Sequence, residues 1–379
     1  MCSSDLRIPG VTLTREITGE GLQIQIRGLG TNFTRVLLNG APVASASTGR
    51  TDSGSANREV DMDFLPGELF SRVTVVKSPT ASMLEGGAAG IVDMRSARPF
   101  DKKGLRSAFT LTGTKNQQAD RWGNRGSALV SNTWGETLGV LAGVAWSTNK
   151  VKTTGFESIG WTNANLLASQ SSSATRNSTG GGNWTIPGTV PANAGNGLTT
   201  GATINEAFLL ANNPGLTITQ LDNAIIPRLG RSMVAEGSRD RQNAILSMEF
   251  RPTPEAQLFL DTIYGHKRNE FERTDMNWVG RNGSSIPLNL QVDRSDCTSG
   301  CVVTKGTFAN SQYFLEYRPY TEDTKFQSIN PGAKLKITDA ISLDVQANAT
   351  RSDFHRQSPT VLFQTALGSG ITKIGRAHV

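Results

Sequence analysis

The strictest pattern in this 379-residue chain is a run of ten residues in which apolar and polar side chains alternate. The run occupies 341–350, ISLDVQANAT, with apolar residues at the odd positions and polar residues at the even ones. A β-strand places successive side chains on opposite faces, so this run predicts a strand with one apolar and one polar face. Shorter runs repeat the pattern at 109–112, 246–250 and 258–264.

The composition argues against several other architectures. Charged residues make up 18% of the chain, below the usual value of about 25%, and the chain has 40 glycines. This balance disfavours a coiled coil, a helical bundle and an acidic disordered chain. The longest apolar run, 138–146, is about half as long as a transmembrane helix requires. A transmembrane β-barrel stays compatible, because its apolar signal is spread over alternate residues.

The connections between the predicted strands fall into two length classes. Tight turns are expected at 134–138, 252–256 and 338–340, and long polar loops at roughly 159–240 and 279–312. Short turns at one end and long loops at the other are typical of a transmembrane barrel, whereas a soluble sandwich more often keeps its loops short.

The expected strand length and the placement of aromatic residues also favour a transmembrane barrel. The strand that begins at Leu258 is expected to extend beyond the bilayer, through Asn269 or further. Several aromatic residues are expected near strand ends, as in an interfacial girdle: Trp134, Trp146, Trp161, Tyr264 and Trp278. A soluble β-domain remains the alternative for these patterns.

Residues 7–100 differ in sequence pattern from the rest of the chain and predict a small α+β domain. Short strands are expected at 23–27, 35–38, 72–77 and 90–95, separated by Gly, Pro and Asn. Asn39-Gly40 predicts a tight turn. Short helical turns are expected at 64–70 and 78–84, and 99–104 is expected to link this domain to the strand-rich region 101–373.

The two ends of the chain share one unusual property. Residues 1–6 (MCSSDL) and 374–379 (IGRAHV) can both be written as translations of a single nucleotide string read on opposite strands, and that string resembles a common sequencing adapter. We therefore expect both ends to be translated adapter and the gene to be cut at both sides. On this hypothesis Cys2 and His378 carry no function.

Several motifs in 7–100 carry a family resemblance. IQIRGLG at 24–30 is followed by RVLLNGAP at 35–42, DMDFLPGELF at 61–70, VTVVKSP at 73–79, EGGAAG at 85–90 and VDMR at 92–95. In order and spacing these motifs resemble the plug domain of TonB-dependent outer-membrane receptors. The FLP-EL and LEGGAAG-VDMRSARPFD variants resemble the branch found in xanthomonads and caulobacters.

The resemblance implies a fold and a function. It implies an α+β plug domain followed by an antiparallel transmembrane β-barrel, incomplete here and 22-stranded with a plugged lumen in the full-length family. It also implies an outer-membrane receptor of a Gram-negative bacterium, which admits a carbohydrate or an iron chelate (siderophore) to the periplasm. The energy would come from the TonB complex of the inner membrane, whose contact segment is expected to be missing here. No cofactor is implied.

Residues of the plug can be given expected roles. Gly28 and Gly30 are expected to permit a tight turn, and Arg27 and Glu85 to meet charges of the barrel wall. The motif further includes Asn39, Gly40, Gly86 and Gly87. The polar stretch 43–58 is expected to face outward, with ligand contacts from Arg50, Asp52, Asn57 and Arg58. A flexible loop without a ligand role, or ordinary exposed charges, remain the alternatives.

The resemblance also bears on the cysteines, because the family is exported to an oxidising compartment. Cys297 and Cys301 enclose Thr-Ser-Gly in a predicted outer loop, and a disulfide between them is expected rather than a metal site, which would lack a nearby His.

Other function classes have thin support. His266 and His355 are the remaining histidines, and no catalytic or metal motif surrounds them. The GLG of 28–30 lacks the third glycine of a nucleotide-binding loop. The formal charge of +6 fits a neighbour of anionic lipopolysaccharide better than a nucleic-acid partner. A soluble or surface β-rich binding protein remains the alternative function, and a hydrolase the third.

Overall fold

The computed structural model describes residues 8–15, 21–43, 59–62, 65, 67–78, 80–81, 83–164, 166–171, 184–366 and 368–376. The chain divides into two compact units. The first comprises residues 1–153, 236–272 and 319–358, and the second comprises residues 154–235, 273–318 and 359–379. The second unit is therefore built largely from what the sequence predicts as long loops.

The plug region contains two small sheets. One pairs β1 (Val11–Arg15) with β2 (Gly21–Ile26). The other has the order β4-β3-β6-β5, with β3 parallel to β6 and the remaining pairs antiparallel. Its strands are β3 (Thr34–Leu38), β4 (Ala41–Pro42), β5 (Phe70–Val76) and β6 (Gly90–Ser96). The predicted strands of 7–100 are thus confirmed.

Helical structure in the plug region is limited to 3-10 turns. These are η2 (Thr31–Phe33), η4 (Gly67–Leu69) and η5 (Pro99–Asp101). The described residues of 78–84 form bends and a turn instead of the expected short helix, since Gly86 and Gly87 follow too soon for a helix to propagate. No α-helix occurs in the described residues of 8–100, and η4 lies where a helical turn was expected at 64–70.

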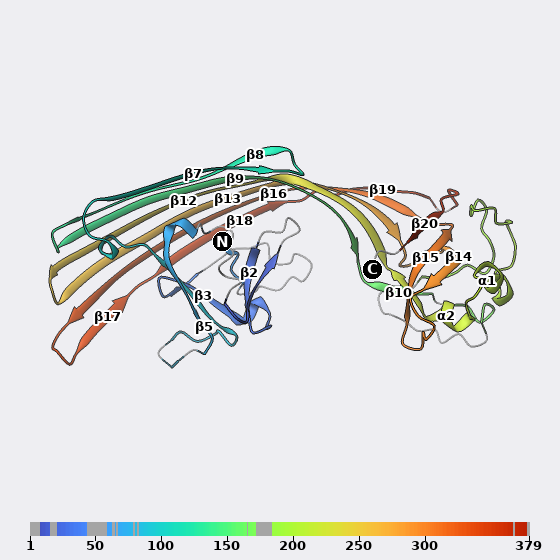
Figure 1. Ribbon diagram of the computed structural model, residues 1–379, viewed down its shortest axis with the longest axis horizontal. Coiled ribbons are helices and arrows are strands. Elements are labelled where there is room, and N and C mark those ends of the chain that lie inside the picture. Colours follow the sequence, from blue (N-terminus) through green and yellow to red (C-terminus); the bar gives the residue numbers. More distant parts are fainter. Residues whose placement is uncertain are drawn as a thin grey trace. The chain divides into compact units, whose positions relative to one another are not determined.

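The strands after residue 105 form one antiparallel meander, with the order β17-β16-β13-β12-β9-β8-β7. Figure 1 shows them side by side in chain order. The first three are β7 (Arg106–Asn116), β8 (Arg121–Trp134) and β9 (Leu138–Ser158). The next are β12 (Leu229–Thr253), β13 (Ala256–Val279) and β16 (Tyr313–Lys336). Three strands pair with β16: β17 (Ser342–Gln346), β18 (Ala349–Gln357) and β19 (Val361–Gln364).

The predicted turns and strand lengths are confirmed. β8 ends at Trp134 and β9 begins at Leu138, and the other two tight turns join β12 to β13 and β16 to β17. β13 has 24 residues, so it is about 80 Å long and extends past Asn269. The run 341–350 is interrupted between β17 and β18, where Ala347 N donates to Pro331 O at 2.9 Å.

In the first unit, the meander packs one face against the plug. We call the meander the wall of this unit. Alternate residues of the wall belong to the same buried cluster as plug residues of β1, β2, β3 and β6. These wall residues are Leu141, Ala145, Ile245, Ile263 and Phe326. We call this the inner face. The opposite, outer face exposes apolar side chains on every strand: Phe109, Leu111, Val130, Val144, Leu246, Met248, Phe250, Leu258, Tyr264, Ile329, Leu335, Leu343 and Val345. Such an area is far larger than a solvated surface normally exposes.

The second unit has its own sheet and core. The sheet has the order β10-β11-β15-β14, with β20 also paired to β15. Its strands are β10 (Trp161–Asn163), β11 (Ala224–Pro227), β14 (Ile286–Val292), β15 (Cys301–Ala309) and β20 (Lys373–Arg376). Two helices, α1 (Glu206–Asn212) and α2 (Ile218–Asn223), accompany it. Residues 374–376, assigned to adapter on the sequence, are the last three of β20.

The core of the second unit corrects one expectation. Trp278 was expected in an interfacial girdle, but its side chain is buried among Trp184 and Phe308 of this core. The ring of Trp278 lies 5.0 Å from that of Phe308. A girdle position was inferred from proximity to a strand end, whereas the loops that follow the strand fold over the ring. Within the described residues, no helix is long and apolar enough to cross a membrane.

Candidate functional site

The turn after β2 depends on residues in the left-handed region. Arg27 has φ 57° and Gly28 has φ 70°, and Arg27 N donates to Gly10 O at 2.8 Å. Only glycine adopts this region without a steric cost, which accounts for Gly28. Gly30 has φ −58° and precedes η2, so its backbone is one that other residues adopt. The Arg27 side chain donates to Ser78 Oγ at 3.2 Å, within the plug.

Asn39 and Gly40 form the two-residue turn between β3 and β4. Both have positive φ, 52° and 83°, as a type I′ turn requires. The buried Asn39 side chain accepts from Ser96 N at 2.9 Å and donates to Ser96 Oγ at 3.0 Å. From β17, Gln346 Nε2 donates to Asn39 O at 2.8 Å. The turn therefore joins β3, the end of β6 and the wall.

The glycine-rich segment 85–90 packs closely against β3 at Gly87. A Cβ at Gly87 would lie 2.6 Å from Gly90 O and 3.0 Å from Arg35 Cβ, so no larger residue fits without movement. Ala89 N donates to Phe33 O at 3.0 Å, which fixes this segment to η2. Gly86 has φ 106°, and Glu85 is exposed.

The contact between plug and wall is both polar and apolar. Glu68 of η4 pairs with Arg125 of β8, and Gln346 pairs with the turn at Asn39. The wall also contributes the five apolar side chains of the shared cluster described above. Separation of the plug region from the wall would therefore expose some apolar surface, in addition to breaking polar contacts.

A cavity of about 350 Å³ lies inside the plug, between its two sheets. Its lining is apolar apart from Ser71 and Arg72, with side chains such as Val11, Met62 and Phe70. An apolar lining offers few groups for a charged ligand. The expected ligand contacts Arg50, Asp52, Asn57 and Arg58 all lie in 44–58, outside the described residues.

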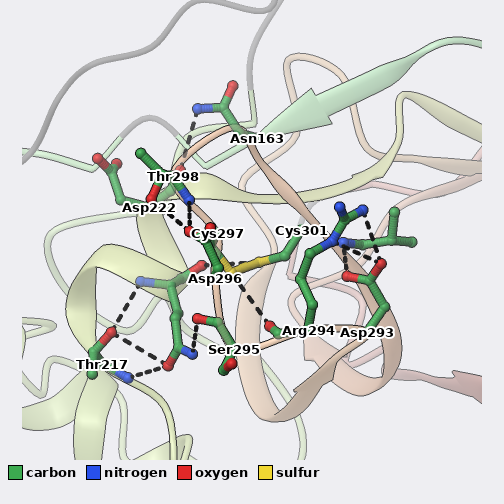
Figure 2. The surroundings of a disulfide bond; sticks show 12 residues. Asn163, Thr217, Asp222, Asp293, Arg294, Ser295, Asp296, Cys297, Thr298 and Cys301 are labelled. Atoms are coloured by element: carbon green, nitrogen blue, oxygen red, sulfur yellow. Dashed lines mark hydrogen bonds and ion pairs between the residues drawn. A yellow bond between two sulfur atoms is a disulfide. The ribbon is translucent and has the colours of Figure 1, made fainter.

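The loop that carries the cysteines is compact and cross-linked. Cys297 and Cys301 form a disulfide with 4.8 Å between their Cα atoms, directly before β15 (Figure 2). Asp293 accepts from Val302 N at 2.7 Å, and this bond lowers the pKa of its carboxyl group. Asp296 accepts from Thr298 Oγ1 at 2.6 Å, which lowers the pKa of its own carboxyl group.

Sequence reasoning missed a charged network in the second unit. The Asp275 carboxylate is fully buried and accepts from Arg273 Nε at 2.9 Å. It also pairs with Arg318, and with Arg231 at 3.8 Å. Glu157 and Glu316 supply the other carboxylates. Three cations face three anions, so the network is neutral and joins β9, β12, β13 and β16. The alternation Arg273, Asp275, Asn277 along one face was the available signal.

His266 and His355 both lie beside the same carboxylate. His266 Nε2 lies 2.9 Å from Asp323 Oδ2, and His355 is the register partner of Asp323 across β16 and β18. These groups lie on the outer face of the sheet. Among the residues that the structure describes, no group of three or more His, Cys, Asp or Glu could hold a metal ion.

The plug domain resembles known proteins in sequence. The model of the family "TonB-dependent Receptor Plug Domain" matches residues 5–92. A ferric enterobactin receptor, PirA of Pseudomonas aeruginosa, is 34% identical over 110 residues, which are 27% of this chain and 15% of that receptor. The ferrienterobactin receptor of Escherichia coli K12 is 36% identical over 88 residues, 22% of this chain and 12% of that receptor.

Solved structures were also compared. The siderophore receptor PirA from Pseudomonas aeruginosa aligns over 94% of this chain and 56% of its own, with 13% identity and a TM-score of 0.29. The ferric citrate transporter FecA aligns over 94% and 57%, with 12% identity and a TM-score of 0.33. The chain thus spans little more than half of these receptors. The plug-domain match and the siderophore-receptor relatives together support a TonB-dependent receptor.

Proposed function

We propose that this chain is part of a TonB-dependent outer-membrane receptor, which captures an iron chelate and admits it to the periplasm. The match of the plug family to residues 5–92 carries the proposal. The sheet that faces this plug supports it, because its outer face is apolar over the length that a bilayer would cover. The outer face of β13 is apolar from Leu258 to Tyr264 apart from Thr262, and polar from His266 to Thr274.

The energy source follows from the location. An outer membrane holds no usable ion gradient, so uptake requires work delivered from the inner membrane by the TonB complex. The complete receptor would be a 22-stranded barrel around the plug, beside anionic lipopolysaccharide and with no nucleic-acid partner. The contact segment for TonB and the remaining strands would lie outside this chain. The adapter interpretation of 1–6 and 374–379 and the xanthomonad or caulobacter branch belong to the same proposal.

The names of the relatives favour an iron chelate as the ligand, since they are receptors for ferric enterobactin. Arg50, Asp52, Asn57 and Arg58 in the plug would contact it. The motif variants FLP-EL and LEGGAAG favour a carbohydrate as the second candidate, through the branch that they resemble. A soluble or surface β-rich binding protein remains the alternative to both.

Fractionation and competition binding separate these candidates. The complete gene product should stay in the membrane pellet until detergent is added, because its outer face is apolar. Labelled ferric enterobactin should bind saturably, and unlabelled maltodextrin should fail to displace it. Saturable binding of the sugar alone would favour the carbohydrate candidate. Full solubility without detergent would favour the soluble protein.

A further inference from the structure

The segment that leaves the plug, 98–101, is fixed to the inner face of the wall by a buried ion pair. Arg98 Nη2 donates to Asp261 Oδ2 of β13 at 2.6 Å, and Arg98 Nε donates to the same oxygen at 3.2 Å. The Asp261 side chain is 2% exposed, and its other oxygen accepts from Ser247 Oγ of β12 at 2.6 Å. Both oxygens of the Asp261 carboxylate therefore accept hydrogen bonds, one from Arg98 of the segment and one from Ser247 of β12.

Two aromatic rings complete the attachment. The Arg98 guanidinium lies over the Phe259 ring of β13, 4.1 Å from its centroid. In the reverse direction, the Arg251 guanidinium of β12 lies 4.0 Å from the centroid of Phe100. Cation–π contacts of this kind are strengthened where water is excluded. Glu249, also 2% exposed, lies 3.5 Å from Arg251 and 4.0 Å from Arg98.

The backbone of the segment is fixed as well. Asp101 Oδ2 accepts from Arg98 N at 2.9 Å, and Asp101 N donates to Arg98 O at 3.1 Å, so η5 is closed at its start. The ring of Pro99, the residue after Arg98, restricts its own φ. At Gly139 of β9, a Cβ would lie 2.9 Å from Pro99 Cβ and from Phe100 Cε2, so the wall has room for this segment only because a glycine faces it.

The ion pair that holds the body of the plug is more accessible to water. Glu68 and Arg125 have side chains 22% and 45% exposed, against 2% for Asp261. Water stabilises the separated partners of an exposed pair, but separation of Arg98 from Asp261 leaves a buried carboxylate without its cation. The attachment of 98–101 thus resists separation more than the Glu68–Arg125 pair does.

We propose that residues 98–101 are a permanent anchor: they stay bound to β12 and β13 while the TonB complex remodels the plug, so that remodelling ends before Arg98. Arg98 and Asp261 are then positioning residues, which return the plug to its place after each cycle. This inference rests on the proposed function. It differs from a releasable lock, in which the same ion pair would have to open for the ligand to pass.

A covalent replacement of the ion pair distinguishes an anchor from a lock. The complete receptor is made as the Arg98→Cys/Asp261→Cys variant and cross-linked on cells with a short bismaleimide. The probe is uptake of ⁵⁵Fe-labelled ferric enterobactin. We expect a several-fold loss of uptake before cross-linking and recovery close to the unsubstituted receptor afterwards. Cross-linked protein that binds the probe but fails to take it up would overturn the anchor, as would full uptake before cross-linking.

Two controls separate this inference from the proposed function. Cross-linking the Glu68→Cys/Arg125→Cys variant should abolish uptake, because it ties the body of the plug to β8. Lys103→Gln removes a nearby ion pair with Glu136 whose side chains are both more than half exposed, and it should leave uptake unchanged. Absence of uptake by the unsubstituted receptor would reject the proposed function and the anchor with it. Uptake that survives the Glu68–Arg125 cross-link would leave the proposed function standing and would overturn the anchor alone.

Discussion

Trp146 of β9 lies over Gly126 of β8 on the outer face of the sheet, where the two residues are register partners. A Cβ at Gly126 would come within 2.3 Å of the indole Cζ2. The glycine therefore creates the space that the indole occupies, at the level where the apolar outer face of β9 gives way to Thr148 and Lys150.

Gly126→Val should destabilise the sheet, because the indole would be forced off its present position. Overpacking of this kind costs about 1–3 kcal/mol. Gly113→Val is the matched control on the neighbouring strand, since its Cβ would meet Trp122 at an ordinary 3.7 Å. Urea unfolding in detergent micelles measures both. Equal midpoints for the two variants would show that the Trp146 contact does not constrain the fold.

Leu246→Lys should be strongly unfavourable in lipid. Leu246 lies on the outer face, within the apolar set, and a lysine at mid-bilayer costs about 2–4 kcal/mol in a transmembrane barrel. Gln242→Lys, on the same face of β12 but beyond the apolar set, should cost far less. Folding into phospholipid vesicles measures the difference. Similar costs at both positions would mean that the outer face does not contact lipid.

Removal of the disulfide should weaken the second unit. Cys297→Ser/Cys301→Ser opens a short loop, for which the entropic account gives a loss of about 2 kcal/mol. Hydrogen exchange of β14 and β15 should accelerate, whereas exchange of β7 and β8 in the first unit should not change. Chemical reduction of the unsubstituted protein should reproduce the effect. Unchanged exchange in β14 and β15 would contradict the role of the disulfide.

The loop at 293–298 should lose stability in acid. The hydrogen bonds to Asp293 and Asp296 lower the pKa of both carboxyl groups in the folded state. Their contribution is therefore fully present above the unfolded pKa of about 3.9, and it is lost as the pH falls through the lower, folded values. Asp293→Asn should flatten this dependence in exchange measured at β15.

Asp339→Asn is the control for the acid effect, because that carboxylate is 98% exposed in the turn between β16 and β17. It should leave the exchange of β15 and its pH dependence unchanged. A pH profile of β15 that is the same in Asp293→Asn and in the unsubstituted protein would contradict the assignment.

Local signals in the sequence account for much of the fold. The period of two identified the meander, and Asn39-Gly40 identified the turn between β3 and β4 of the plug region, in both cases without reference to distant residues. The second unit could not be predicted in this way, because β11 pairs in parallel with β15 across more than seventy positions. The burial of Trp278 has the same cause. Short segments whose partners are far away in sequence leave no periodicity to detect.

The candidate site shows a similar division. Gly28 of the plug motif was identifiable because its backbone requirement, a positive φ, is local. Arg98 was read only as part of the VDMRSARPFD motif, and its partner Asp261 lies more than 160 positions away. Pairing of charges across strands depends on register, which a single sequence does not specify. Asp275 and its arginines were missed for the same reason.

Uptake of ⁵⁵Fe-labelled ferric enterobactin by cells that carry the complete gene, with and without a working TonB complex, tests the central claim most directly. We predict equal saturable binding in both strains and accumulation only in the strain with TonB. Accumulation that is equal in both strains, or no membrane-associated binding of any iron chelate, would contradict the account.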